Sequence, residues 1–186
     1  MSREHEVAAE SARLDRVFRA KAGAEIAAAE QLGGGPPAVC AHGDELAEVL
    51  LAKGEPGPRD IERGCALAGP DGDAADKALD ALGLPAERFG FCTRIPGATD
   101  AERALRVRML VEAVDPSVVV ALDPYAASDL SEALGIDPLE AGVTRMWRGR
   151  TLLAVEGLEA SLTDEDLKRR VWRQFKALAA ADTPQT

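Results

Sequence analysis

Hydrophobic positions divide the chain into segments with helical and extended patterns. Within residues 1–32, apolar side chains recur close to the 3.6-residue period of a helix, and charged side chains occupy the positions between them. The apolar positions are Val7, Leu14, Val17, Phe18 and Ile26. Three glycines and two prolines at 33–37 end the pattern. We expect an amphipathic helix over 1–32 that packs on or beside a domain at 36–181, a dimer contact being the alternative, and a flexible tail at 182–186.

The rest of the chain alternates short apolar runs with helical periodicities. Strands are predicted at 38–41, 88–95, 118–122 and 151–155, and helices at 45–53, 73–82, 99–114, 124–134 and 163–178. Five glycines and three prolines at 54–72 predict a long irregular loop. The run Val118–Leu122 is apolar throughout, as in a strand with helices on both faces. This order predicts an α/β fold, a three-layer α/β/α sandwich around a central parallel sheet of about four strands.

Charge and hydropathy narrow the possible functions. The chain carries 22 Lys and Arg against 32 Asp and Glu, a formal net charge of -10. Because such a surface repels phosphate, we expect weak or no DNA binding. The first twenty residues lack the apolar core of a signal peptide, and no run approaches the roughly 20 apolar residues of a membrane span. The sequence therefore predicts a cytoplasmic protein without membrane contact.

The three cysteines do not form a metal-binding pattern. Cys40, Cys65 and Cys92 are widely spaced, with no Cys-x-x-Cys pair. We therefore predict no metal site and no cofactor.

Candidate functional residues follow from the predicted sheet, since parallel α/β sheets bind ligands at the carboxyl ends of their strands. Loops that begin at His42, Arg94, Asp123 and Glu156 would meet there. His42 could act as a base near neutral pH, or could simply hydrogen-bond a loop. The carboxylates of Asp44, Glu45, Asp123 and Glu156 could converge on Mg²⁺ or a cationic ligand, although their spacing is no metal signature.

The order of segments from 38 to 178 resembles the uracil-DNA glycosylase superfamily, especially its bacterial family 4 and 5 branches. Gly-Pro-Asp-Gly at 69–72 is similar to the Gly-Pro-Ala-Gly turn of those enzymes, and Pro-Ser-Val-Val-Val-Ala-Leu at 116–122 is similar to their Pro-x-Val-Ile-Val-x-Leu strand. A Lys-x-x-x-Trp pattern at 168–172 completes the series. The resemblance implies an α/β/α scaffold and an ancestry in DNA repair.

The family's catalytic motifs are altered in this chain. Its first motif, Gly-Glu-x-Pro-Gly, falls on Ala41–Glu45 when the predicted strand at 38–41 is taken as the first strand. The phenylalanine that stacks on uracil falls on Leu67, and the asparagine that reads the base falls on Thr93. The histidine that stabilises negative charge on uracil falls on Gly157. The four-cysteine iron-sulfur cluster of family 4 is not expected.

Two hypotheses follow from this resemblance. In the first, base excision is lost and the chain is a binding or regulatory module for an unknown protein or small ligand, with the option of a homodimer. Its vestigial pocket would comprise Leu67, Gly69, Pro70, Gly72, Thr93, Asp123 and Gly157. In the second, an active glycosylase or related hydrolase uses His42, Asp44 or Glu45 to activate water.

Overall fold

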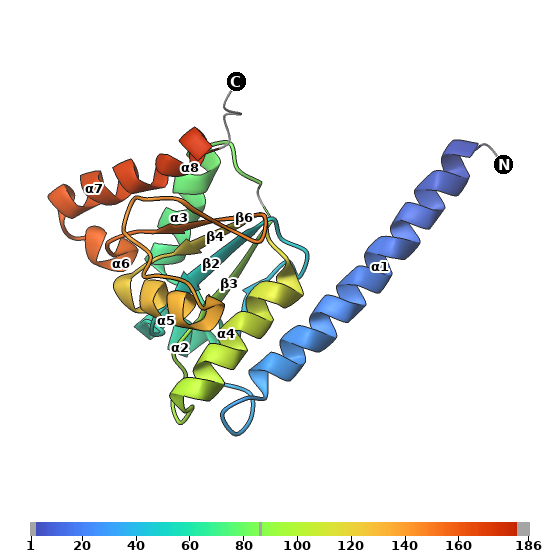
Figure 1. Ribbon diagram of the computed structural model, residues 1–186, viewed down its shortest axis with the longest axis horizontal. Coiled ribbons are helices and arrows are strands. Elements are labelled where there is room, and N and C mark those ends of the chain that lie inside the picture. The colour runs from blue at the N-terminus through green and yellow to red at the C-terminus, as the bar shows by residue number, and fades with distance from the viewer. Residues whose placement is uncertain (1–2, 86, 182–186) are drawn as a thin grey trace.

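The computed structural model describes residues 3–85 and 87–181, and the predicted tail at 182–186 lies outside them. A six-stranded mixed sheet forms the centre, in the order β1-β3-β2-β4-β6-β5 (Figure 1). The strands are β1 (His42–Gly43), β2 (Val49–Lys53), β3 (Arg88–Cys92), β4 (Val118–Ala121), β5 (Arg145–Trp147) and β6 (Arg150–Ala154). β3, β2, β4 and β6 pair in parallel, and the short edge strands β1 and β5 pair antiparallel. The α/β class is confirmed, but the sheet is mixed and larger than the four parallel strands expected.

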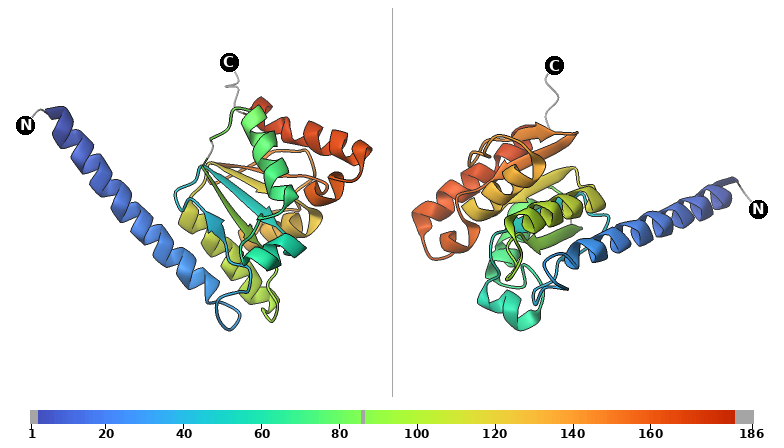
Figure 2. Two further views of the ribbon diagram at one scale, coloured as in Figure 1. Left: turned by 180° about the vertical axis from the view of Figure 1, so that it is seen from behind. Right: turned by 60° about the horizontal axis from the view of Figure 1, so that its bottom comes forward.

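Helices lie against both faces of this sheet (Figures 1 and 2). α4 (Asp100–Val114), α5 (Pro124–Leu134) and the end of α1 (Arg3–Glu30) pack on one core, and α3 (Pro70–Ala81), α6 (Leu158–Ser161), α7 (Glu165–Phe175) and α8 (Ala177–Ala181) pack on the other. A short helix, α2 (Pro58–Arg63), follows β2. Among the described residues, no helix is both long and apolar enough to cross a membrane.

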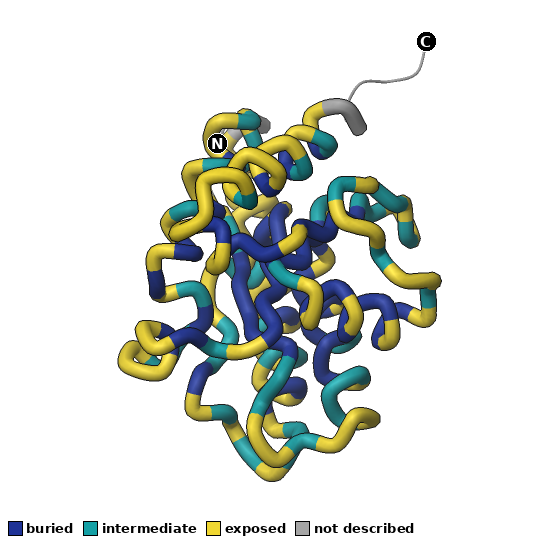
Figure 3. The backbone as a smooth tube through the Cα atoms, turned by 90° about the vertical axis from the view of Figure 1, so that its left-hand side faces the viewer, coloured by how far each residue is buried: buried dark blue, intermediate teal, exposed yellow. Residues whose placement is uncertain are grey.

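Side chains of the central strands alternate between the two cores. Val49 and Leu51 of β2 face α3 and α7, whereas Leu50 and Ala52 face α4 and α5. All four are buried, which explains why the strand is apolar up to its last residue, Lys53. Figure 3 shows that buried segments gather in the interior of the molecule and exposed ones at its outside.

The strand predicted at 118–122 and the helices predicted at 99–114 and 124–134 are confirmed. The apolar run at 118–122 contains β4, and α4 begins with the capping box of Thr99 and Glu102. Asp123 caps α5, because its Oδ1 accepts the Ala126 N–H at 2.9 Å.

The region before α3 corrects the sequence predictions. The helix predicted at 45–53 is a turn followed by β2, and the predicted strand at 38–41 forms only an isolated bridge, between Cys40 and Cys65, with β1 starting at His42. The predicted loop at 54–72 contains α2 and the first turn of α3. The spacing of Leu46, Val49 and Leu50 fits a helix as well as a strand, because periodicity alone does not distinguish a short apolar run such as Val49–Ala52 in a strand from one in a buried helix.

The C-terminal helix also differs from its prediction in two details. α7 is capped by Asp164, whose Oδ1 accepts the N–H groups of Asp166 and Leu167 at 3.0 Å, and Thr163 lies before the cap. Trp172 lies on the apolar stripe that the helical pattern at 163–178 predicts to face inward, but it is 38% exposed.

The N-terminal helix packs on the domain only near its end. Ala22 and Ala29 are buried, and Ile26 packs against the core beside α4. The preceding turns extend away from the domain (Figures 1 and 2), so that Val7, Leu14, Val17 and Phe18 are exposed. The structure therefore places only the last turns of α1 against the domain.

Candidate functional site

A pocket of about 450 Å³ opens at the carboxyl ends of β2, β4 and β6. Segments that follow these three strands form most of its wall, as expected for a parallel α/β core. Its lining residues are Lys53, Glu55, Asp71, Leu122, Asp123, Pro124, Tyr125, Glu156, Gly157, Leu158, Glu159 and Ala160. Of the residues proposed from the sequence, Asp123, Glu156 and Gly157 lie here.

Lys53, the last residue of β2, is the central charge of this pocket. Its Nζ contacts Asp71 Oδ2 at 2.6 Å, Asp60 Oδ2 at 3.0 Å and Glu159 Oε2 at 3.0 Å. The three carboxylates come from α3, α2 and α6, so the ammonium joins helices from separate parts of the chain. Lys53, Asp60 and Asp71 are buried, while Glu159 is exposed.

Burial alone would lower the pKa of Lys53, but hydrogen bonds with Asp71, Glu159 and Asp60 outweigh it and raise the pKa above its ordinary value. Lys53 therefore keeps its charge at neutral pH. A permanently protonated ammonium with three carboxylate partners cannot act as a base or nucleophile.

Asp60 also organises the backbone of the loop around Lys53. Its Oδ2 accepts the Gly57 N–H at 2.8 Å, and its Oδ1 accepts the Ala68 N–H at 2.8 Å. The loop at 54–69 is therefore held through one buried carboxylate rather than by apolar packing alone.

The pocket has an excess of negative charge. Five carboxylates line it, those of Glu55, Asp71, Asp123, Glu156 and Glu159, against the single ammonium of Lys53. Two of them are engaged beyond the Lys53 cluster, because Glu156 Oε2 accepts from Arg170 at 2.8 Å and Asp123 Oδ2 accepts the Gly54 N–H at 2.7 Å. This lining repels a phosphate backbone.

Thr93 belongs to a separate buried cluster. Its hydroxyl donates to Asp129 Oδ2 at 2.6 Å, and Arg94 Nε donates to the same oxygen at 3.0 Å. Arg103 Nε lies 3.2 Å from Asp129 Oδ1. Because Thr93 is fully buried and is not among the residues that line the pocket, it is not placed to read a base there.

Tyr125 is the aromatic side chain of the pocket wall. The guanidinium carbon of Arg94 lies 4.1 Å from the centre of its ring, a cation-π contact. That face of the ring is therefore already covered.

His42 lies away from this pocket. It belongs to β1, opposite Gly90 in the middle of β3, and lines a different hollow of about 220 Å³ together with Leu67 and Gly72. The sequence placed it at the carboxyl edge, because the segment at 38–41 was taken as a parallel strand.

Asp44 and Glu45 are also remote from the pocket. Asp44 follows β1 and pairs with Arg19 of α1, whose Nη1 lies 2.6 Å from its Oδ1, and this hydrogen bond lowers the pKa of Asp44. Glu45 Oε2 lies 3.9 Å from the same guanidinium nitrogen. The four carboxylates proposed as ligands for Mg²⁺ therefore do not converge, and within 3–85 and 87–181 no group of three His, Cys, Asp or Glu could hold a metal.

The remaining predicted pocket residues shape the backbone. Gly69 is the N-cap of α3 and Pro70 is its first residue. Leu67 has a φ of 58°, and its carbonyl oxygen would lie 2.0 Å from a Cβ at position 72, so that only glycine fits there. Leu67 and Gly72 thus line the hollow beside His42 rather than the carboxyl-edge pocket.

The segment that directly follows β2 was predicted as part of a loop, but its position at the carboxyl-edge pocket was not. It reads Gly54-Glu55-Pro56-Gly57, a run of two glycines and a proline around one carboxylate. A Cβ at Gly54 would lie 2.6 Å from Tyr125 Cβ, so this close approach requires glycine. The signal was present in the sequence, but the helix predicted at 45–53 hid the strand that ends in Lys53.

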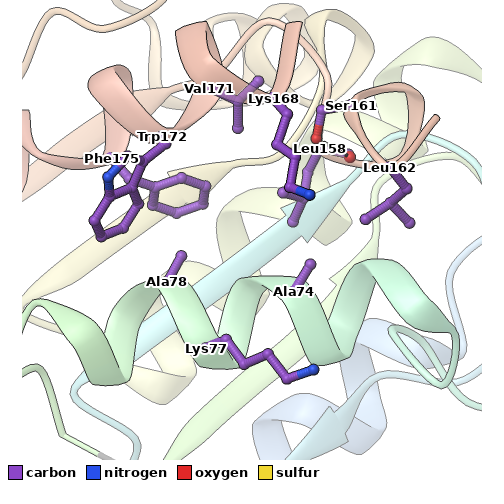
Figure 4. Close-up of a pocket in the computed structure, with 10 residues that line it drawn as sticks. All are labelled: Ala74, Lys77, Ala78, Leu158, Ser161, Leu162, Lys168, Val171, Trp172 and Phe175. Atoms are coloured by element: carbon purple, nitrogen blue, oxygen red, sulfur yellow. Dashed lines mark hydrogen bonds between the residues drawn. The ribbon is translucent and has the colours of Figure 1, made fainter. Parts of the chain in front are cut away.

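A second pocket of about 290 Å³ lies between α3, α6 and α7 (Figure 4). Ala74 and Ala78 of α3 form one wall, and Val171, Trp172 and Phe175 of α7 form the other. Its lining contains no carboxylate, histidine or cysteine, so it offers no acid, base or nucleophile other than lysine and one serine. The pocket at the carboxyl edge is therefore the candidate functional site.

Comparison of the chain with protein-family models and with curated proteins finds no match.

Proposed function

We propose that this chain is a cytoplasmic uracil-DNA glycosylase-like protein that has lost base excision and acts as a binding or regulatory module. The observation that carries the proposal is the state of its carboxyl-edge pocket, where the Lys53 ammonium is held by Asp71, Asp60 and Glu159 and an excess of carboxylates lines the wall. A base-flipping enzyme must attract phosphate and offset the cost of unstacking a base, and this pocket opposes the first requirement.

The scaffold supports the resemblance. The strands β3, β2, β4 and β6 pair in parallel between two hydrophobic cores, and β1 and β5 extend the sheet to six strands; this arrangement supports the proposed α/β/α scaffold. Gly54-Glu55-Pro56-Gly57 follows β2, the first parallel strand in the chain, and is similar to the family's Gly-Glu-x-Pro-Gly motif shortened by one residue. These features support common ancestry with the superfamily better than the earlier placement of the family's first motif on Ala41–Glu45 does.

The loss of excision is supported at the position that would stabilise the leaving base. Gly157 occupies the place of the family's histidine and lines the pocket, with a φ of 154° that side-chain-bearing residues rarely adopt. The backbone there suits glycine, and the described residues that line the pocket include no imidazole to stabilise negative charge on a departing base.

A second candidate, a hydrolase with a remodelled pocket, is favoured by one observation. Glu55 lies in the shortened motif, is exposed and lines the pocket, so its carboxylate is the group best placed to activate water. His42, Asp44 and Glu45 cannot serve this role at the pocket, because they lie elsewhere in the fold.

The test is release of free base from uracil-containing single-stranded and duplex oligonucleotides at low salt, together with binding of the same DNA by fluorescence anisotropy. We expect neither release nor binding, although low salt gives electrostatic attraction its best opportunity. Binding without release would contradict the charge argument and leave DNA as the ligand of the module.

Variants separate the two candidates. Base release that is abolished by Glu55→Gln, but kept by His42→Ala and by Glu6→Gln on the remote helix α1, would overturn the first proposal in favour of the hydrolase. Glu6→Gln is the matched control, because it makes the same change of charge on an exposed side chain outside the pocket.

A further inference from the structure

Cys40 and Cys65 lie directly opposite each other on an isolated parallel bridge. The Cys40 N–H donates to the Gly64 carbonyl at 3.0 Å, and the Ala66 N–H donates to the Cys40 carbonyl at 3.0 Å. These two hydrogen bonds fix the register, since they join Cys40 to Gly64 and Ala66, the residues on either side of Cys65. The bridge joins the segment after α1 to the segment between α2 and α3.

The two side chains point to the same side of this bridge. Their neighbours Val39 and Ala66 are buried against Cys92, and successive side chains in extended segments alternate between faces. Cys40 and Cys65 therefore lie on the face away from this small core, and both are partly exposed.

The spacing of the bridge suits a disulfide. Neighbouring strands lie about 4.8 Å apart, which falls within the Cα separation of roughly 4.4–6.8 Å that disulfides span. We propose that Cys40 and Cys65 are a thiol modification site that forms a reversible intramolecular disulfide. This inference does not depend on the proposed function of the carboxyl-edge pocket.

Oxidised glutathione is a suitable oxidant for this reaction. One cysteine thiolate attacks a sulfur of oxidised glutathione, a mixed disulfide forms, and one glutathione thiolate leaves. The second cysteine thiolate then attacks the protein sulfur of the mixed disulfide and displaces the second glutathione. The two cysteines lose two protons and two electrons in total, and oxidised glutathione becomes two molecules of glutathione.

The surroundings of Cys40 set the rate of this reaction. Burial, and secondly the nearby Glu30 carboxylate, raise the pKa of its thiol, which donates to the Pro37 carbonyl at 3.4 Å. Because the thiolate is the reacting species, oxidation is expected to accelerate as the pH rises above neutrality. Because both cysteines are partly exposed, the disulfide is expected to be accessible to thiols and easily reduced.

Cys92 provides an internal control. It is 1% exposed in β3, and burial raises the pKa of its thiol to about 12. A protonated and enclosed thiol is inert toward disulfides and alkylating reagents. The chain therefore contains one unreactive thiol against which the pair can be compared.

The test treats the folded full-length protein with oxidised glutathione, blocks remaining thiols with an alkylating reagent under denaturing conditions, and maps the peptides by mass spectrometry. We expect a linked peptide containing Cys40 and Cys65, one alkylated thiol at Cys92, and full reversal by reduced glutathione. Oxidation of the urea-unfolded protein should also yield pairings with Cys92, because the native register is then lost.

Variants make the outcome decisive. Cys40→Ser and Cys65→Ser should each retain a glutathione adduct on the remaining partner, since nothing resolves it, whereas Cys92→Ala should oxidise as the natural chain does. Circular dichroism of each reduced variant verifies that it is folded. Three alkylated thiols after oxidation, a native disulfide that includes Cys92, or links only between chains would each overturn the proposal.

Discussion

Lys53 shows what a single buried charge contributes to this fold. Its ammonium lies among three carboxylates, each from a different helix. Two of these carboxylates, those of Asp60 and Asp71, are buried with it. Lys53→Met should lower the free energy of unfolding by about 3–5 kcal/mol, because Asp60 and Asp71 would be left as uncompensated buried charges. Urea denaturation measures this loss, and Lys77→Met, which changes an exposed lysine of α3, should have little effect.

A double variant tests the cause of that loss. Asp71→Asn in the Lys53→Met background removes one of the stranded carboxylates, so it should recover part of the stability instead of adding a further loss. Additive losses from the two substitutions would contradict the view that the charges act as a unit.

Cys92 predicts how stability responds to alkaline pH. Burial raises the pKa of its thiol to about 12, so the folded chain retains a proton that the unfolded chain loses above a pKa of about 8.5. The free energy of unfolding should therefore fall as the pH rises between these values, by at most about 1.4 kcal/mol per pH unit. Lys53 acts in the same direction because its pKa is also raised.

Urea unfolding at pH 8, 9 and 10 under reducing conditions isolates the contribution of the thiol. Cys92→Ala should reduce the slope of stability against pH relative to the natural chain, since the titrating group is removed. Equal slopes for the two proteins would show that the thiol does not couple folding to pH.

At the level of elements, Asp123 joins the start of α5 to the loop after β2. One carboxylate oxygen accepts the Ala126 N–H as an N-cap, and the other accepts the Gly54 N–H. Asp123→Ala should cost about 1–3 kcal/mol, because both contacts are lost at a partly buried position. Asp164→Ala, which removes the exposed cap of α7, should cost about 1 kcal/mol. Equal losses in urea denaturation would show that the contact with Gly54 adds nothing.

Elements that carry their own local signals were predictable from the sequence. The strand at 118–122 is apolar at every position. Thr99 and Asp123 are residue types that favour the N-terminus of a helix, because their side chains accept hydrogen bonds from nearby backbone N–H groups. β2 was not predictable in this way, since Leu46, Val49 and Leu50 fit a helical spacing. Pairing with β3 on one side and β4 on the other decides its conformation, and these contacts involve residues 39 to 69 positions away.

The sequence predicted only those residues of the candidate site that directly follow a correctly predicted strand. Asp123, Glu156 and Gly157 follow correctly predicted strands, and the structure brings them to one pocket. The Lys53 cluster depends on contacts with Asp60, Asp71 and Glu159, which come from three different helices. The hydrophobic pattern of the sequence carries no information about contacts between side chains of separate helices. In addition, a lysine is ordinarily expected at the surface.

At the scale of the whole molecule, the last turns of α1 pack on the domain and its first turns are exposed to solvent. Residues 5–18 are exposed, whereas Ala22 and Ala29 are buried near α4. Because most helical stability in proteins comes from tertiary packing, the amides of 5–18 should exchange with solvent much faster than those of α4. Hydrogen exchange with mass spectrometry checks this expectation. Equal protection along all of α1 would show that its free turns are covered by another surface, such as a second copy of the chain.

The projecting turns of α1 also govern how the molecule moves through water. Residues 5–18 extend over about 20 Å at roughly 1.5 Å per residue, which is long relative to a domain of this size. A single chain of 19.6 kDa with such an arm experiences more friction than a sphere of equal mass. It should therefore elute early from a size-exclusion column and tumble anisotropically, so that elution volume alone would overstate its mass and light scattering is needed to count its chains.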